Sequence, residues 1–214
     1  MIETVFFDLD GVIIDSEPVH AKAKRLTLDE YGIGYPESIF DKFIGQTDED
    51  FFGYVSAESD GKYSPGLLLQ KKNELFIGLL PEMEFVDGFP SFFRQVRNKG
   101  LRTALVSSTS AYTLEWIDRY FNITRLFDLL VTEKDTANHK PHPEPYLRAL
   151  QLLPASTGST IVIEDSPNGI LSAKNAGCKV FALATSFKKE KLSEADEIFE
   201  GYAELSARLG FPME

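Results

Sequence analysis

The sequence predicts an α/β fold in which a parallel sheet is interrupted by an inserted group of helices. Three observations lead to this prediction. From Asp87 onwards, near-continuous apolar strands alternate with helical segments, which is typical of a parallel sheet covered on both faces. Residues 16–82 contain only helical patterns, and a first strand precedes them. We therefore expect a Rossmann-like core formed by residues 1–15 and 83–214, with residues 16–82 as a helical insert.

The composition is that of an ordinary globular protein. Its 214 residues are 43% hydrophobic and 26% charged, enough for a medium domain with an insert. A formal net charge of −11 argues against general binding to nucleic acid or anionic membranes, and no apolar run approaches membrane-spanning length. Cys178 is the only cysteine, which excludes an internal disulfide, and the first residues lack a signal-peptide pattern. We expect a cytoplasmic monomer.

The first strand, residues 5–7, is followed by two carboxylates, those of Asp8 and Asp10. Gly11 follows, and glycine permits a turn or a close backbone approach. Neighbouring carboxylates repel each other, and a divalent cation compensates this repulsion. Mg²⁺ prefers hard oxygen ligands and is usually held by few carboxylates together with phosphate oxygens. Taken alone, however, this Asp-x-Asp-Gly sequence is equally consistent with a simple strand-end turn.

Three helices are expected in the insert. The first helix is indicated by four residues at helical spacing, Val19, Ala23, Leu26 and Glu30. Two glycines, Gly32 and Gly34, mark its end. The second lies around 48–56, and the third covers 66–80, where Pro81 stops it. One face of the third helix carries a lysine within an apolar stripe: Leu68, Lys72, Leu75 or Phe76, and Leu79. This lysine is either a snorkelling side chain at the edge of the stripe or a functional group.

The remaining elements follow an alternating order from Asp87 onwards. Ser110 is a suitable helix N-cap, while Gly100 and Gly177 follow helices where a C-terminal glycine is favoured. Helices are expected at 90–99, 110–120, 143–153 and 167–176, and again at the C-terminus. Strands are expected at 102–106, 129–132, 160–164 and 179–183, with a short one at 197–199.

Polar residues follow the strands of this predicted sheet. Ligands of open parallel sheets bind beyond the carboxyl ends of the strands. The residues found there are Asp8 and Asp10, Ser107, Lys140 a few residues past the third strand, and Glu164 with Asp165. Together they are the parts that phosphoryl transfer requires. Carboxylates can hold Mg²⁺, a lysine offsets phosphate charge, a hydroxyl contacts phosphoryl oxygens, and one acid can attack phosphorus.

Four segments resemble the motifs of the haloacid dehalogenase-like hydrolases: Asp8 to Glu17, Val106-Ser107-Ser108, Lys140 to Pro143, and Glu164 to Ile170. More narrowly, the chain resembles the β-phosphoglucomutase-like group of sugar-phosphate phosphatases and mutases. The resemblance covers essentially the whole chain. It implies a Rossmann-like core whose insert at 16–82 is a helical cap domain.

The resemblance implies a role for each core residue. Asp8 matches the nucleophile that forms an aspartyl-phosphate, and Asp10 matches the acid/base that protonates the leaving oxygen and then activates water. Ser107 matches the hydroxyl that bonds the phosphoryl group, and Lys140 matches the lysine that holds nucleophile and phosphate together. The implied Mg²⁺ ligands are Asp8, Asp10 through its backbone carbonyl, Asp165, and Glu164 beside it.

The same resemblance implies that the cap closes over the sugar and excludes water. Lys72 stands where the family has a substrate-facing cap lysine, and Gly45 and Gln46 match its specificity loop. His20 stands where mutases of this group have a histidine linked to the acid/base. With Ser108, these residues form the expected substrate-binding set. On spacing alone, His20 is better explained as a partly buried, hydrogen-bonded histidine, and Gly45-Gln46 as a surface turn.

The leading hypothesis is a Mg²⁺-dependent phosphatase that hydrolyses a small phosphorylated metabolite, a sugar or polyol phosphate. The main alternative is a β-phosphoglucomutase, which returns the phosphoryl group to the sugar. Against it, the arginine that such mutases use after the specificity loop is replaced by Asp48-Glu49-Asp50, although Lys71 or Lys72 could compensate. A non-catalytic phospho-receiver is a third hypothesis. A receiver takes its phosphorylated aspartate from a middle strand, so the motif order here favours the enzyme.

Overall fold

The computed structural model describes residues 2–43 and 47–211. The chain divides into two compact units, one formed by Met1–Asp15 and Glu84–Glu214 and the other by Ser16–Met83. The larger unit contains a six-stranded sheet, and the smaller unit is helical. The function of the smaller unit as a cap stays a prediction.

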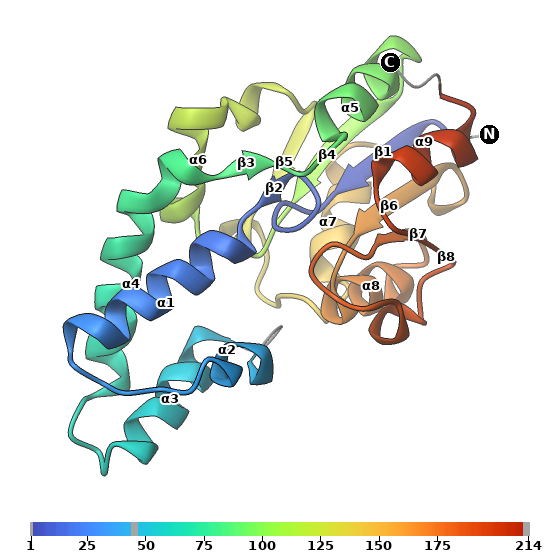
Figure 1. The fold of residues 1–214 in the computed structure, drawn as a ribbon. Coiled ribbons are helices and arrows are strands. Elements are labelled where there is room, and N and C mark those ends of the chain that lie inside the picture. Colours follow the sequence, from blue (N-terminus) through green and yellow to red (C-terminus); the bar gives the residue numbers. More distant parts are fainter. Residues whose placement is uncertain (1, 44–46, 212–214) are drawn as a thin grey trace. The chain divides into compact units, whose positions relative to one another are not determined.

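The six-stranded sheet is parallel throughout, in the order β5-β4-β1-β6-β7-β8 (Figure 1). Its strands are β1 (Thr4–Phe7), β4 (Arg102–Val106), β5 (Leu129–Val131), β6 (Thr160–Glu164), β7 (Lys179–Leu183) and β8 (Glu197–Phe199). In β1, Phe7 is level with Leu105 of β4 and with Ile163 of β6. The carboxyl ends of three strands therefore lie side by side. The predicted α/β class and its parallel sheet are confirmed.

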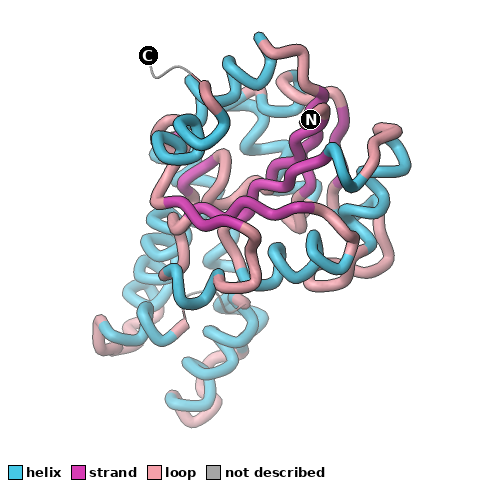
Figure 2. Tube along the Cα trace, turned by 90° about the vertical axis from the view of Figure 1, so that its right-hand side faces the viewer, coloured by secondary structure: helices cyan, strands magenta, loops and turns pink. Residues whose placement is uncertain are grey.

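Helices cover both faces of this sheet, as Figures 1 and 2 show. Successive residues of a strand point to opposite faces, and Phe6 and Phe7 of β1 mark the two sides. Phe7 contacts Phe89, with ring centroids 6.0 Å apart, on α5 (Phe89–Asn98), which packs with α9 (Tyr202–Leu209). Phe6 belongs to a buried cluster with residues of α7 (Glu144–Leu152) and α8 (Pro167–Asn175). Both faces are apolar because both are covered.

A second, two-stranded sheet pairs β2 (Ile14–Asp15) with β3 (Glu84–Phe85) in antiparallel fashion. The chain leaves the larger unit after β2 and re-enters it through β3. These strands were not predicted, because two residues are too few to produce a periodic signal. The other elements of this unit are α6 (Ala111–Phe121) and short 3₁₀ helices at 123–125, 133–135, 157–159 and 189–192.

The smaller unit consists of α1 (Glu17–Glu30), α2 (Ser38–Lys42), α3 (Asp48–Glu58) and α4 (Pro65–Leu79), followed by a 3₁₀ turn at 80–82. Its core is rich in aromatic and aliphatic side chains: Leu28, Ile39, Phe43, Phe51, Phe52, Val55 and Leu68. Thr47 begins α3 with a capping box, because its hydroxyl accepts from the Asp50 amide and the Asp50 carboxylate accepts from the Thr47 amide. The five-residue α2 was not predicted, since it is too short for helical periodicity.

The predicted stripe on α4 is buried as expected and consists of Leu68, Lys72, Phe76 and Leu79. Lys72 is only 2% exposed. It is therefore not a snorkelling side chain that reaches solvent, which was one of the two interpretations of its position.

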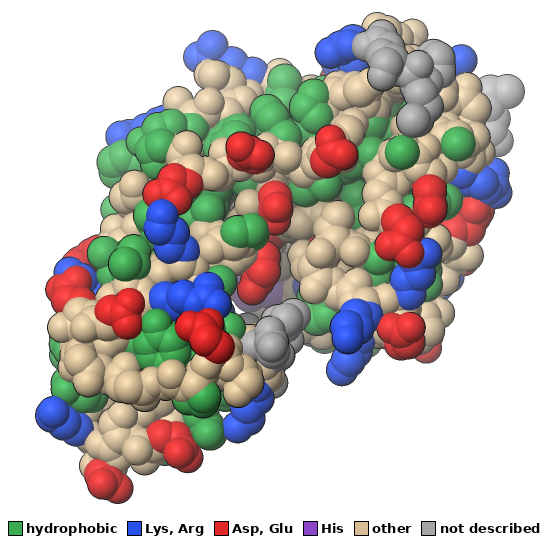
Figure 3. Space-filling view, viewed as in Figure 1, with side chains coloured by type: hydrophobic (Ala, Val, Ile, Leu, Met, Phe, Trp, Pro, Cys, Tyr) green, Lys and Arg blue, Asp and Glu red, His purple; other side chains and the backbone are tan. Residues whose placement is uncertain are grey.

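Charged side chains of both signs are interspersed on the face drawn in Figure 3, so lysine and arginine side chains there do not form one continuous basic patch. Among residues 2–43 and 47–211, no helix has both the length and the apolar character needed to cross a membrane.

Candidate active site

The candidate site lies at the carboxyl edge of the central strands. Hydrogen bonding of β1 continues one residue past the strand, because the Asp8 amide donates to the Ile163 carbonyl at 3.1 Å. In the same way the Ser107 amide donates to the Val131 carbonyl at 3.0 Å. Backbone bonds thus fix both residues at the points where the strands end.

Lys140 joins three of the strand ends. Its Nζ donates to Asp8 Oδ1 at 2.5 Å, to Glu164 Oε1 at 2.6 Å and to the Val106 carbonyl at 3.0 Å. The Lys140 side chain is 7% exposed and the Glu164 side chain is fully buried. Buried charges require such partners, since their desolvation is otherwise uncompensated. The lysine is therefore held against the predicted nucleophile.

Three carboxylates meet at this edge. Asp8, Glu164 and Asp165 each place one oxygen within 4.8 Å of the others. Burial raises the pKa of Asp8 to about 7; the charge of Lys140 opposes this rise, while Glu164 and Asp10 add to it. Burial, together with the charges of Asp8 and Glu164, also holds the pKa of Asp165 well above its usual range.

The charges of the cluster favour a divalent cation. Burial disfavours the charge of Lys140, but Asp8 and Glu164 outweigh it and raise the pKa of the lysine. This cationic side chain contacts two of the three clustered carboxylates, those of Asp8 and Glu164. All the acidic groups are hard oxygen donors, which Mg²⁺ and Ca²⁺ prefer, so the donor set fits such an ion.

Gly11 brings the turn after β1 against this cluster. It has a φ of +70°, and a Cβ built there would overlap the Asp165 carboxylate and Ser186 Oγ. Thr185 Oγ1 donates to the Gly11 carbonyl at 2.6 Å. A larger residue is therefore excluded by both conformation and space.

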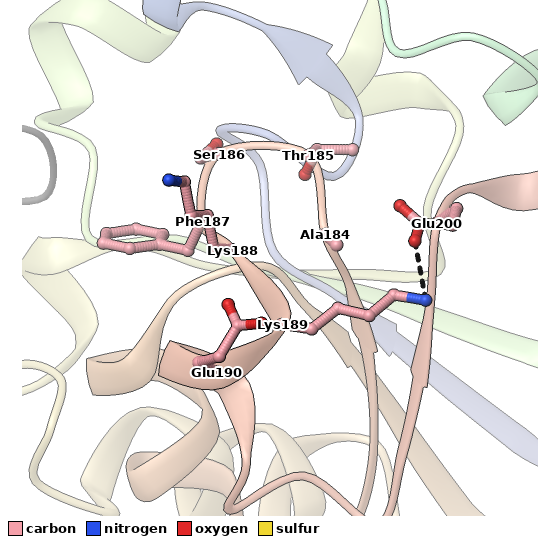
Figure 4. A pocket seen from close by; sticks show the side chains of 8 residues that line it. All are labelled: Ala184, Thr185, Ser186, Phe187, Lys188, Lys189, Glu190 and Glu200. Carbon is pink, nitrogen blue, oxygen red and sulfur yellow. Dashed lines mark ion pairs between the residues drawn. The ribbon is translucent and has the colours of Figure 1, made fainter. Parts of the chain in front are cut away.

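Thr185 and Ser186 belong to the loop that follows β7, which lines a cavity of about 440 Å³ (Figure 4). An ion pair between Lys189 and Glu200, 2.7 Å long, lies at the side of this cavity. The loop was not predicted as part of the site, since its hydroxyl residues form no recognised motif. Only their position just after a strand could have indicated them.

Asp10 is held by a residue that was also not predicted. Thr109 Oγ1 donates to Asp10 Oδ2 at 2.6 Å, and the Thr109 amide donates to Ser107 Oγ at 2.9 Å. A serine hydroxyl that accepts this bond can still donate its own hydrogen to a ligand. Ser108 lies exposed between them. The available signal was the run of hydroxyl residues directly after β4.

The smaller unit contains a separate buried charge cluster. Lys72 Nζ lies 2.5 Å from Asp48 Oδ2 and 2.8 Å from His20 Nδ1, while Lys24 Nζ lies 3.1 Å from Asp48 Oδ1. The His20 ring stacks on Phe76, with centroids 4.2 Å apart. The structure thus brings together two of the predicted substrate-binding residues, His20 and Lys72. The other two in this unit, Gly45 and Gln46, lie outside the described residues.

The charge of Asp48 makes the smaller unit sensitive to acid. Burial opposes this charge, but Lys72 and Lys24 outweigh it and lower the pKa of Asp48 below 3.8. A carboxyl whose pKa is lower in the folded than in the unfolded state stabilises the fold above the unfolded pKa, and this contribution disappears as the pH falls through the folded pKa. We expect the smaller unit to lose stability below about pH 4 for this reason.

The variant Asp48→Asn tests this expectation. At pH 7 it should reduce the free energy of unfolding by about 3 kcal/mol, because Lys72 loses its carboxylate, and the deficit should shrink below about pH 4. Chemical denaturation at a series of pH values measures both effects. Glu37→Gln, which breaks an exposed pair with Arg25, is the matched control. A deficit that does not depend on pH would contradict the assignment.

Residues 5–183 match the family model described as haloacid dehalogenase-like hydrolase. The chain belongs to this family. The resemblance inferred from the four motifs is therefore confirmed.

Two relatives of this haloacid dehalogenase-like hydrolase are named phosphatases. A validoxylamine A 7'-phosphate phosphatase of Streptomyces hygroscopicus subsp. limoneus is 28% identical over 205 residues, which cover 96% of each chain. A phosphorylated carbohydrates phosphatase of Thermotoga maritima is 31% identical over 181 residues, which cover 82% of each chain. The expectation of an enzyme, a phosphoric monoester hydrolase of this family, is confirmed.

Solved structures of the same family have the same fold. One, from Thermotoga maritima and provisionally named a β-phosphoglucomutase, superimposes with a TM-score of 0.81 at 26% identity. The match covers 92% of this chain and 94% of that one.

Proposed function

We propose that the chain is a Mg²⁺-dependent phosphatase that hydrolyses a small sugar or polyol phosphate through an aspartyl-phosphate on Asp8. One observation carries the proposal: at the carboxyl edge of the central strands Asp8 is bonded to Lys140, and Asp10 is held by Thr109. A nucleophile and a proton carrier are thereby separately oriented in one site.

In the first step, an oxygen of Asp8 attacks phosphorus and the bond from phosphorus to the substrate oxygen breaks. The departing oxygen takes a proton from Asp10. In the second step, water transfers a proton to Asp10 and attacks phosphorus, so that the bond to Asp8 breaks and inorganic phosphate leaves. Lys140 holds Asp8 in place in both steps, and the Ser107 hydroxyl donates to a phosphoryl oxygen.

Mg²⁺ would be held by the carboxylates of Asp8 and Asp165 and by the backbone carbonyl of Asp10. When bound, it neutralises negative charge on the phosphoryl oxygens. Its support here is the buried, hard-oxygen donor set with its excess of negative charge.

We propose that residues 16–82 act as the cap that selects the substrate. One phosphatase relative is named for validoxylamine A 7'-phosphate and the other for phosphorylated carbohydrates, and the second name supports a sugar phosphate as the substrate. His20 and Lys72 provide hydrogen-bonding groups suited to hydroxyl oxygens, while the charge of Lys72 is paired with Asp48.

The β-phosphoglucomutase alternative is favoured by the Thermotoga maritima structure but opposed by the charges of the smaller unit. A mutase must hold a second phosphate. Asp48 replaces the expected arginine and pairs with Lys72, and Lys71 pairs with Glu30 at 2.7 Å. Both lysines that could compensate are thus engaged by carboxylates, which supports hydrolysis.

A phosphate-release screen tests the proposal. It compares sugar, polyol and nucleotide monophosphates with and without MgCl₂, and follows isomerisation of β-glucose 1-phosphate in parallel. We expect release from sugar or polyol phosphates only with Mg²⁺. Isomerisation faster than release would instead support the mutase, and release without any divalent cation would contradict the metal requirement.

The variant Lys72→Met tests the role of the cap. If Lys72 contacts substrate hydroxyls, KM for a sugar phosphate should rise roughly tenfold or more, the value of a hydrogen bond to a charged group. KM for p-nitrophenyl phosphate, which lacks those hydroxyls, should change little. Lys62→Met, an exposed lysine of the same unit, is the control. Equal effects on both substrates would mean that Lys72 supports the fold without contacting the substrate.

A further inference from the structure

Glu164, at the end of β6, has no exposed surface, and both of its carboxylate oxygens are engaged. Oε1 accepts from Lys140 Nζ and from the Tyr146 hydroxyl, each at 2.6 Å. Oε2 accepts from the Asp165 amide at 3.2 Å and from Ser166 Oγ at 3.3 Å. An ionised carboxylate offers about four lone-pair sites, and four donors address them here.

The helix behind Glu164 closes the remaining space. A Cβ built on Gly169 would overlap both carboxylate oxygens of Glu164, so the first turn of α8 is in direct contact with the carboxylate. Ser166 N-caps this helix, since its hydroxyl accepts from the Gly169 amide at 3.1 Å. Glu164 is therefore enclosed by backbone on this side.

Tyr146 completes the enclosure from α7. It is fully buried, and besides its bond to Glu164 its ring lies with its centroid 5.0 Å from Lys140 Nζ. A cation near an aromatic face is stabilised, and the same tyrosine thus contacts the lysine through its ring and the glutamate through its hydroxyl.

We infer that Tyr146 is a positioning residue: with Glu164, it fixes Lys140 against Asp8, and Glu164 serves this purpose instead of binding the metal. Glu164 lies close enough to Asp8 and Asp165 to be a ligand by distance alone, within 4.8 Å. Its lone pairs, however, already accept from protein donors. Replacing these donors by a cation would leave Lys140 and the Tyr146 hydroxyl without their buried acceptor, which is unfavourable.

The acidic side chains of the cluster thus fall into two groups with different roles. Asp8 and Asp165 face the ligand, while Glu164 stands behind Lys140 and acts through it. The kinetic part of this inference rests on the proposed phosphatase function, but the metal-binding part does not.

Tyr146→Phe tests the positioning role, because it removes one hydroxyl and keeps the ring. We expect kcat to fall about tenfold with KM unchanged within about twofold, since a loosened Lys140 affects the reacting group more than the bound ground state. Tyr202→Phe is the matched control. Tyr202 is equally buried, but its hydroxyl donates to a backbone carbonyl, that of Val12, at 2.8 Å. It should lose comparable stability and retain kcat.

Titration of the purified full-length protein with MgCl₂ by calorimetry tests the metal part without any turnover. The dissociation constant of Tyr146→Phe and of Glu164→Gln should stay within about threefold of that of the parent protein. Asp165→Asn should weaken binding by about 100-fold, in the range seen when metal affinity depends on a given side chain. Thermal melting identifies any variant that fails to fold. If Glu164→Gln fails to fold, the Mg²⁺ affinity of Tyr146→Phe is compared with that of the parent protein instead.

Two results would overturn the inference. One is a Tyr146→Phe variant with the kcat of the parent. The other is a folded Glu164→Gln variant that loses Mg²⁺ affinity as strongly as Asp165→Asn, which would make Glu164 a ligand. If the parent protein hydrolyses no phosphate ester, the proposed function fails, and the calorimetric comparison still decides the role of Glu164.

Discussion

Replacing Asp8 with asparagine is expected to lower kcat for every phosphate ester by about 10⁴-fold or more, the scale of losing a nucleophile. The amide is nearly the same size as the carboxylate but cannot form an acyl phosphate. It also keeps an oxygen that can accept from Lys140, so the bond at 2.5 Å has a replacement. The loss should therefore be chemical and not a failure to fold, which thermal melting checks. Asp87→Asn, at an exposed position, is the control.

The companion variant Asp10→Asn separates the two steps. With p-nitrophenyl phosphate, whose leaving group needs little protonation, Asp8 should still be phosphorylated, but water should not be activated. We expect a stoichiometric burst of p-nitrophenol followed by slow turnover, and mass spectrometry should locate one phosphoryl group on the peptide that contains Asp8. Asp8→Asn should give neither burst nor label. Turnover retained by Asp8→Asn would exclude the aspartyl-phosphate route.

The strand ends were predictable from sequence because local signals define them. β1, β4 and β6 are apolar runs bounded by polar residues, and in a parallel sheet such ends meet at one edge. This is why Asp8, Ser107 and Glu164 could be placed together from the amino-acid sequence alone. Lys140 was placed with them less directly, as a residue a few positions past the third predicted strand, because its reach to the site depends on tertiary structure.

The partners of these residues were not predictable. Thr109, Tyr146 and Thr185 each bond a residue of the site through the side-chain hydroxyl. A hydroxyl in a loop or a tyrosine in a helix has no distinctive pattern in one sequence, and the spacing of Tyr146 indicates only the apolar face of its helix. Contacts between residues far apart in the chain decide which of them matter, and hydrophobic periodicity does not record such contacts.

The pairing of Asp48 illustrates the same limit. The sequence has an acid where a mutase has an arginine, but it leaves open whether neighbouring lysines compensate. Only the fold of the smaller unit brings Lys72 and Lys24 to the two oxygens of Asp48. An aspartate in place of the arginine thus also pairs with the charges of Lys72 and Lys24, and so alters the positive charge available to a substrate.

Lys140→Met is expected to lower kcat by about 10²–10³-fold, comparable with removing one oriented donor from an active site. Methionine replaces the length of the side chain but not its charge, and the bonds to Asp8, Glu164 and the Val106 carbonyl are all lost. Breaking a buried ion pair by removing one partner typically destabilises a protein by about 3–5 kcal/mol. This value is the upper limit for Lys140→Met, because Asp8 can take up a proton when its partner is lost. Lys22→Met, which breaks a half-exposed pair with Glu82, should cost at most about 1 kcal/mol.

The loss of stability in Lys140→Met should grow with pH in the metal-free protein. Burial raises the pKa of Asp8 to about 7 in the parent, and because the lysine charge opposes this rise, its removal raises the pKa further. A carboxyl whose folded pKa lies above its unfolded value loses stability as the pH rises toward the folded pKa. In the parent protein, the loss of stability caused by ionisation of Asp8 ends near pH 7. In the variant, the same loss continues above pH 7. Denaturation with a metal chelator present, at pH values below and above 7, should therefore show a widening difference between the two proteins; a constant difference would mean that Lys140 does not control the ionisation of Asp8.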